Sequence, residues 1–197
     1  VRILRTDDMG IVKTRLKVFA QGAVVAAVLT LAIYAARYVQ TSEAARSLIS
    51  SYGYAGLFVI ALISGFNLAV PVPAVAFMPL FLASGLNFWI AIFIIGVGVT
   101  IADVPAYLMG KIGRQAVGVL RGPKIVRWLE GMQGRSRSVP LIVFFFFAAF
   151  IPLPNEVLAA PLGFLGYRLA HILPIAFAGN LVFNMLYTAG LLRVFGA

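Results

Sequence analysis

The sequence predicts an all-α polytopic membrane protein: an inverted repeat with two proline-broken re-entrant helical hairpins, plus an N-terminal transmembrane helix. Of its 197 residues, 62% are hydrophobic and only 11% are charged, and the mean hydropathy is +1.01. A water-soluble domain has about 25% charged residues, so this composition excludes one. The chain contains no cysteine, which also excludes disulfides, thiolate metal sites and cysteine nucleophiles.

The charge of the chain indicates topology. Sixteen basic residues against six acidic ones give a net charge of +10. In a membrane protein such an excess marks cytoplasmic segments and attracts anionic headgroups, so we expect membrane lipids and no nucleic acid as partners. Residues 1–17 form a basic N-terminus, and the apolar residues 18–38 are long enough to span, longer than the apolar region of a signal peptide. We expect a multi-pass protein of the cell (inner) membrane with a cytoplasmic N-terminus.

The first repeat is expected at residues 52–110. Residues 47–102 contain no charge over 56 positions, yet Pro71, Pro73 and Pro79 interrupt them. Each proline removes a backbone donor and disfavours helix just before it. Irregular backbone inside a membrane must be buried in protein or line a wet cavity. We therefore expect a re-entrant hairpin at 52–85, followed by a transmembrane helix from about Asn87 to Gly110.

Residues 111–138 should form a cytoplasmic basic loop, because they carry seven of the sixteen basic residues. Ile125, Trp128, Leu129 and Met132 recur there at helical spacing. This pattern favours a short amphipathic helix in the membrane interface, with anionic headgroups as partners; a solvated basic loop is the alternative.

The second repeat, residues 139–192, follows the same order: an apolar segment, a break at Pro152 and Pro154, a short element and a long uncharged one. Displacing the chain by 81 residues aligns structure-breaking or polar positions: Phe66 with Phe147, Pro71 with Pro152, Pro73 with Pro154, Gly85 with Gly166, Gly98 with Gly179, and Asp103 with Asn184. If 18–38 crosses outward, the two repeats have opposite orientations. Inverted repeats with broken helices are common in transporters, and the paired breaks indicate the binding site.

The candidate functional residues are the few polar ones within apolar segments. Asp103 and Glu156 are the only carboxylates there, and a charge at the membrane centre costs about 2.5–3.5 kcal/mol. Glu156 could instead cap a helix, and Asp103 could be a hydrated acid at a helix end. The full set of predicted substrate- or proton-binding residues is Glu156, Asp103, Asn155, Asn180, Asn184, Tyr107 and Arg168, with Pro71, Pro73, Pro152 and Pro154 as structural breaks.

Three of the other candidates have a structural alternative. Asn180 and Asn184 could be hydrogen-bonding residues between helices, and Arg168 an anchor at the membrane surface. No catalytic Ser-His-acid grouping, metal-ligand set or nucleotide-binding loop is found, so we expect neither an enzyme nor a cofactor.

Several motifs together resemble one family. They are Ser51-Tyr-Gly-Tyr-Ala-Gly-Leu-Phe58, Val70-Pro-Val-Pro73, Gly85, Gly96-Val-Gly98, and Asp103-Val-Pro-Ala-Tyr-Leu-Met-Gly-Lys-Ile-Gly113, followed by Pro152-Leu-Pro154 in the second half. Residues 50–192 thereby resemble the DedA family, the bacterial and archaeal branch of the SNARE-associated (VTT-domain) membrane proteins. The resemblance implies two facing re-entrant hairpins and movement of phospholipids or polyprenyl-phosphate carriers between leaflets, in some members linked to the proton gradient.

The chain departs from that family at its breaks. Ala74 stands where members usually have an acid, and Ala148, Ala149 and Asn155 occupy a region where arginines are usual. A zwitterionic or neutral-headed lipid, or another small solute, is therefore an alternative substrate. We expect lipid translocation; proton-coupled export of small cationic or polar solutes and a non-transporting membrane scaffold remain alternatives, and a homodimer is left open.

Overall fold

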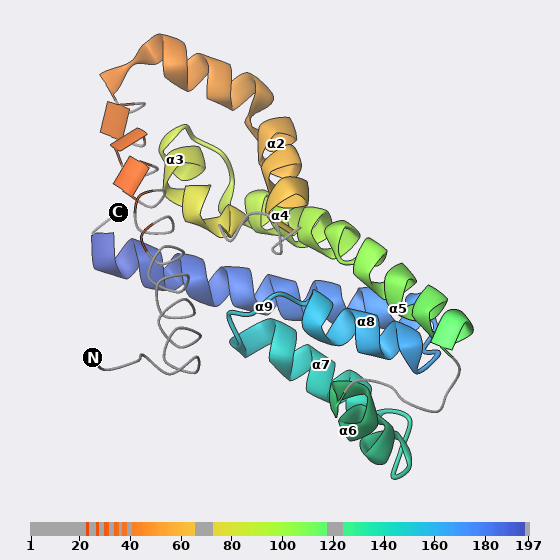
Figure 1. Ribbon diagram of the computed structural model, residues 1–197. Coiled ribbons are helices and arrows are strands. Elements are labelled where there is room, and N and C mark those ends of the chain that lie inside the picture. Colours follow the sequence, from red (N-terminus) through yellow and green to blue (C-terminus); the bar gives the residue numbers. More distant parts are fainter. Residues whose placement is uncertain are drawn as a thin grey trace, which may run out of the picture.

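The computed structural model describes residues 41–65, 73–117 and 124–195, together with eight single positions between residues 23 and 38. All regular elements within these ranges are helices (Figure 1). The basic N-terminus, most of the transmembrane helix expected at 18–38, and Pro71 lie outside the described residues.

Three helical segments are long and apolar enough to cross a membrane: Glu43–Gly65, Phe88–Arg114 and Leu169–Arg193, with 23, 27 and 25 residues. A span needs about 20 residues, so each is sufficient. Large apolar side chains on these segments are exposed, including Ile63, Phe93 and Leu186. Such side chains suit a surface covered by acyl chains, and the three segments indicate a membrane protein.

Helix α2 (Glu43–Gly65) begins earlier than residue 52, where the uncharged pattern places the start of the first repeat. Ser42 lies just before it, and its Oγ accepts a hydrogen bond of 3.3 Å from the amide of Ala45. Glu43 adds a negative charge to the first turn, which the helix dipole favours. The charged residues that end the uncharged run are thus part of the helix.

A short arm precedes the second long segment. It consists of the 3₁₀ turn η1 (Ala74–Phe77) and helix α3 (Met78–Ala83). Pro73 lies just before η1 with extended backbone, and Pro79 occupies the first turn of α3, where its missing amide hydrogen costs no helical hydrogen bond.

The helix expected from Asn87 to Gly110 is present, but it divides into α4 (Phe88–Ala102) and α5 (Val104–Val117). Asn87 starts it, since its Oδ1 accepts hydrogen bonds from the amides of Trp89 (2.9 Å) and Ile90 (3.2 Å). The division falls at Asp103. Pro105 accounts for it, because proline cannot donate to the carbonyl four residues earlier and its ring displaces that carbonyl.

Helix α6 (Lys124–Gln133) lies within the residues expected to form the basic loop. Val126 and Leu129 are buried, whereas Trp128 is 51% exposed. The reason is tertiary: α6 packs against α7 and α8, and these neighbours select the face that is covered.

The second half contains α7 (Val139–Phe150), α8 (Glu156–Phe164) and α9 (Leu169–Phe195). Their order along the chain is that of the expected apolar segment, short element and long element. The second Pro-x-Pro break, Pro152 to Pro154, separates α7 from α8. In Figure 1 the blue α9 runs beside the green α4, with α7 along its other side, and α5 packs against α8.

The short helices α3 and α8 end in the same way. Gly85 and Gly166 have φ values of 90° and 79°, and they are the glycines with positive φ in the described part of the chain. After α3, the amide of Leu86 donates to Phe81 O and that of Gly85 to Leu82 O. After α8, the amide of Tyr167 donates to Leu162 O and that of Gly166 to Gly163 O. Both are Schellman ends, in which glycine adopts the left-handed conformation without strain.

Glycines also allow the long helices to approach closely. A Cβ added at Gly98 of α4 would lie 2.6 Å from the Cβ of Ala61 in α2. A Cβ added at Gly179 of α9 would lie 2.6 Å from the Cβ of Ala148 in α7. The α2–α4 and α7–α9 pairs therefore share one kind of close contact, between a glycine and an alanine.

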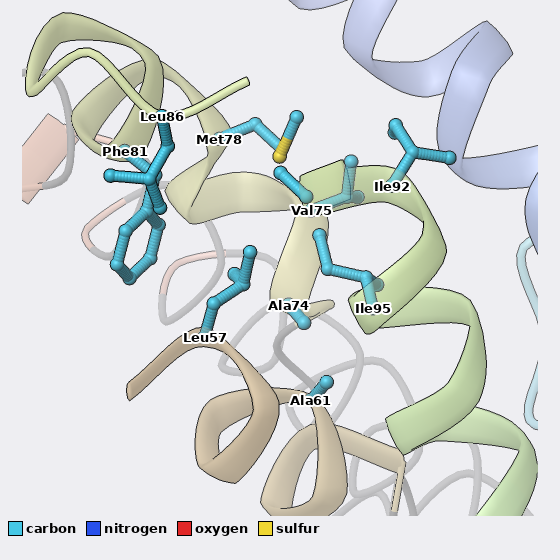
Figure 2. Close-up of a cluster of buried hydrophobic side chains, with 10 residues drawn as sticks. Leu57, Ala61, Ala74, Val75, Met78, Phe81, Leu86, Ile92 and Ile95 are labelled. Atoms are coloured by element: carbon cyan, nitrogen blue, oxygen red, sulfur yellow. The ribbon is translucent and has the colours of Figure 1, made fainter. Parts of the chain in front are cut away.

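Two apolar clusters fill the interior. The first joins α2, the short arm and α4, and Figure 2 shows its side chains, with Leu57, Val75 and Ile95 converging between the three elements. The second cluster contains side chains from α5, α6, α7, α8 and α9, among them Tyr107, Phe144 and Leu162. The polar residues described next lie where elements of both halves meet.

Candidate functional site

The centre of the structure contains a hydrogen-bonded group of polar side chains, the central network: Thr100, Asp103, Asn155 and Asn180. Thr100 belongs to α4, and Asp103 lies at the joint between α4 and α5. Asn155 directly precedes α8, and Asn180 lies in the middle of α9. All four are at least 93% buried.

Asn155 is the hub of the central network. Its Nδ2 donates to Asp103 Oδ2 at 3.0 Å and to Asn180 Oδ1 at 2.9 Å. Asn180 Nδ2 in turn donates to Thr100 Oγ1 at 3.0 Å. Hydrogen bonds in a low-dielectric interior are strong, and losing one partner leaves a costly unsatisfied group. The network thus connects the second Pro-x-Pro break to both long segments.

Asn184 extends the polar face along α9. Its Nδ2 donates to the backbone oxygen of Asn180 at 2.7 Å, and Thr188 Oγ1 donates to Asn184 O at 2.7 Å. Both side chains are buried, at 5% and 0% exposure. These bonds satisfy carbonyls within α9, and Asn184 also borders the cavity described below.

Glu156 is the first residue of α8 and is buried, at 9% exposure. It is close enough for its negative charge to repel that of Asp103, so the structure brings together the two acids predicted from the sequence. Its position in the first turn also agrees with the cap alternative, since a carboxylate there favours the helix dipole. Both roles are compatible with this position.

A cavity of about 280 Å³ adjoins the central network and is bordered by both proline breaks. Its lining comprises Ser64, Pro73, Ala74, Val99, Ala148, Ile151, Pro152, Leu153, Pro154, Asn155, Asn180, Phe183, Asn184 and Tyr187. None of these described lining residues is Lys, Arg or His. The polar side chains of the lining are the carboxamides of Asn155, Asn180 and Asn184 and the hydroxyls of Ser64 and Tyr187, and apolar side chains provide most of the remaining wall.

Two features of the wall bear on what can enter. Phe183 and Tyr187 are stacked, with ring centroids 5.7 Å apart. Ile151 and Leu153 border the cavity and are also 41% and 56% exposed, so the cavity wall continues to the outer surface of the bundle. The site combines a polar interior with an apolar rim.

Two predicted residues lie apart from the central network. Tyr107 is buried, but its hydroxyl donates to Tyr167 O at 2.9 Å. Arg168 is exposed and precedes α9. Tyr107 and Arg168 both border a second cleft.

Thr100 was not among the predicted binding residues, although it lies three residues before Asp103 on the same helical face. Ser64, Phe183, Ile151 and Leu153 were missing as well, and they carry no sequence signal beyond their apolar surroundings. Within the described ranges, no group of His, Asp and Glu could hold a metal ion.

Comparisons of the chain with models of known protein families, with curated proteins and with solved structures give no match. The functional argument therefore depends on the site itself.

Proposed function

We propose that the protein translocates a lipid between membrane leaflets, and that the lipid has a zwitterionic or neutral headgroup. The observation that carries the proposal is the cavity at both Pro-x-Pro breaks, with the central network in its wall. On this proposal the chain is a DedA-like protein of the cell membrane.

The depth of the network supports this function. A helix rises 1.5 Å per residue, so Asp103 lies roughly 22 Å along the segment from Phe88 and roughly 16 Å from Arg114. Asn180 lies roughly 16 Å from Leu169 and roughly 20 Å from Arg193. Both are near the middle of their segments. Polar groups at that depth are costly in a bilayer and mark substrate pathways.

The shape and chemistry of the cavity suit a headgroup. A volume of about 280 Å³ is enough for a headgroup but not for a whole lipid. Asn180 and Asn184 offer amide contacts, while the stacked rings of Phe183 and Tyr187 can hold a quaternary ammonium through cation–π attraction. The exposed Ile151 and Leu153 lie where acyl chains would leave the cavity for the membrane.

The matched contacts of the two halves support an inverted repeat. The glycine ends of α3 and α8 follow the 81-residue spacing, and so do the glycines at 98 and 179. Rocking of one repeat against the other gives alternating access in transporters built this way. We propose that the arms at Pro73 and Pro154 are re-entrant and move with their repeats, and that Asp103 and Glu156 couple this movement to protons.

The test is transport in proteoliposomes containing the full chain and a fluorescent phosphatidylcholine, with dithionite reporting exposure at the outer leaflet. Asn180→Leu should lower the rate about tenfold, the equivalent of about 1.4 kcal/mol of lost hydrogen bonding. Glu156→Gln and Asp103→Asn test the acids. Asn87→Ala is the control, since it removes an amide that caps α4 and does not border the cavity. Equal rates in wild type and in the three site variants would contradict the proposal.

A second candidate function is proton-coupled export of a small cation. The observation that favours it is the cavity lining, which contains no basic residue among the described positions and lies next to two acids. Uptake of a fluorescent organic cation into the same vesicles distinguishes the two. Cation movement that depends on Asp103, without movement of labelled lipid, would replace the lipid proposal.

A further inference from the structure

A second cleft, the basic cleft, lies between α5, the C-terminal end of α8 and the start of α9. Its volume is about 720 Å³. It is bordered by Tyr107, Leu108, Lys111, Arg114, Gly163, Gly166, Tyr167, Arg168 and Leu169. Three of these nine residues are basic and none is acidic. It differs from the cavity at the proline breaks, whose described lining carries no basic side chain.

The three cations converge from two elements. Lys111 and Arg114 are three residues apart in α5 and therefore share a helical face. Arg168 comes from the segment that links α8 to α9. All three are exposed, so their charged ends are accessible to a ligand from outside.

Arg114 has a defined place in the basic cleft. A Cβ added at Gly166 would collide with Arg114 Nη1. The guanidinium group thus packs directly on the backbone of Gly166, at the end of α8. A glycine there serves two purposes, since it adopts the positive φ of the helix end and leaves space for the guanidinium group.

The wall of the cleft is rigid and partly aromatic. Tyr107 OH donates to Tyr167 O at 2.9 Å, and Tyr167 OH donates to Arg137 O at 2.9 Å. Burial raises the pKa of Tyr167 above its ordinary value. A Cβ added at Gly163 would collide with the backbone oxygen of Tyr107, so α5 and α8 touch at this wall. Leu108 and Leu169 complete it with apolar surface.

The position of the cleft indicates the source of its ligand. Arg114 ends the Phe88–Arg114 segment, and Arg168 directly precedes the Leu169–Arg193 segment. The cations therefore lie at the level where two apolar segments reach the membrane surface, which is the level of lipid phosphates. Guanidinium groups bind phosphate oxygens through paired hydrogen bonds, and an ammonium group adds a point charge.

From these observations we infer that the basic cleft binds the phosphate of an anionic phospholipid headgroup, with Lys111, Arg114 and Arg168 as its ligands and Leu108 and Leu169 against the lipid chain. This inference does not rest on the proposed function, because a lipid can be held here whether or not the protein moves lipids. The central network and the cavity beside the proline breaks take no part in it.

The experiment is native mass spectrometry of the full chain in detergent, titrated with phosphatidylglycerol. Detergent removes the diffuse charge of an anionic membrane, so contacts in the cleft dominate binding. The combined variant Lys111→Gln, Arg114→Gln, Arg168→Gln should bind phosphatidylglycerol roughly a hundredfold more weakly, because the loss of each cation should lower the affinity about fivefold. The matched control is Lys124→Gln, Arg127→Gln, Arg135→Gln, which removes the same charge from exposed positions outside the cleft and should change binding less than about twofold.

A second pair of variants separates geometry from charge. Gly166→Ala keeps all three cations but displaces Arg114, and it should weaken phosphatidylglycerol binding about fivefold. Gly85→Ala imposes the same positive-φ strain at a place where a Cβ would meet nothing within 4 Å, so it should leave binding unchanged. Thermal unfolding of both variants verifies that they are folded.

Three outcomes would overturn the inference. One is an equal loss of binding in the cleft variant and in the control variant, which would indicate general charge attraction. Another is equal affinity for phosphatidylcholine and phosphatidylglycerol. The third is displacement of the lipid by inorganic phosphate at equal concentration, which would make this a site for free phosphate.

Discussion

Asn155 donates a hydrogen bond of 3.0 Å to Asp103 Oδ2, and this bond joins two residues that are 52 positions apart. It connects the second proline break to the joint between α4 and α5. The same Nδ2 donates to Asn180 at 2.9 Å, so one amide group connects three segments. The predictions below concern these connections and the helix contacts that make them.

The Asn155–Asp103 pair should be energetically coupled. Asn155→Ala should destabilise the protein by about 1–3 kcal/mol, because it leaves buried groups of Asp103 and Asn180 without their donor. Adding Asp103→Ala to Asn155→Ala should cost less than Asp103→Ala costs in the wild type. Unfolding of the four proteins in detergent measures the coupling free energy. Strictly additive costs would contradict the contact.

Pro105 should matter for geometry more than for stability. Pro105→Ala restores an amide hydrogen and allows α4 and α5 to continue as one helix. The straightened helix should move the Asp103 carboxylate away from the Asn155 amide. We expect the free energy of unfolding to be unchanged or larger and the transport rate to fall. Pro79→Ala is the matched control, since that proline lies in the first turn of α3. The prediction fails if Pro105→Ala transports at the wild-type rate.

Gly110 should tolerate no side chain. A Cβ there would collide with the backbone oxygen of Ala160 in α8, and backbone cannot yield as a flexible side chain does. Gly110→Ala should therefore cost about 1–3 kcal/mol. A Cβ at Gly113, one turn later in α5, would lie 4.0 Å from a ring atom of Phe164 and meet nothing closer. Gly113→Ala should therefore leave the free energy of unfolding unchanged or raise it. Circular dichroism during thermal unfolding compares the two, and equal melting temperatures would argue against the close α5–α8 contact.

Gly98→Ala and Gly179→Ala should have similar effects, because each added Cβ would lie 2.6 Å from an alanine Cβ in the partner helix. We expect each to cost about 1–3 kcal/mol. Gly56→Ala and Gly190→Ala serve as controls on α2 and α9, since neither added Cβ has an atom within 4 Å. A large difference between the two test variants in detergent unfolding would show that the α2–α4 and α7–α9 pairs are not equivalent.

Much of the helical layout was predictable because its causes are local. Long uncharged runs and prolines indicated the long segments that contain α4, α5 and α9 and the Pro-x-Pro break between α7 and α8, and Asn87 was a recognisable start for α4. The start of α2 was not predicted, because the helix includes the charged residues Glu43 and Arg46 that precede the uncharged run. Which side chains of α6 are buried depends on its partners α7 and α8, which the local pattern does not specify.

Residue type and spacing by themselves identified polar residues that the structure buries: Asp103, Asn155, Glu156, Asn180 and Asn184 stand out in an apolar chain because burying them is costly. Only the tertiary structure decided how they are paired. It makes Asn155 rather than an acid the hub, and it places Tyr107 and Arg168 in the basic cleft instead. The reason is that these pairings depend on the close crossings of α5 with α8 and of α4 with α9. Such crossings are set by the fit of whole helix surfaces, which no local pattern encodes.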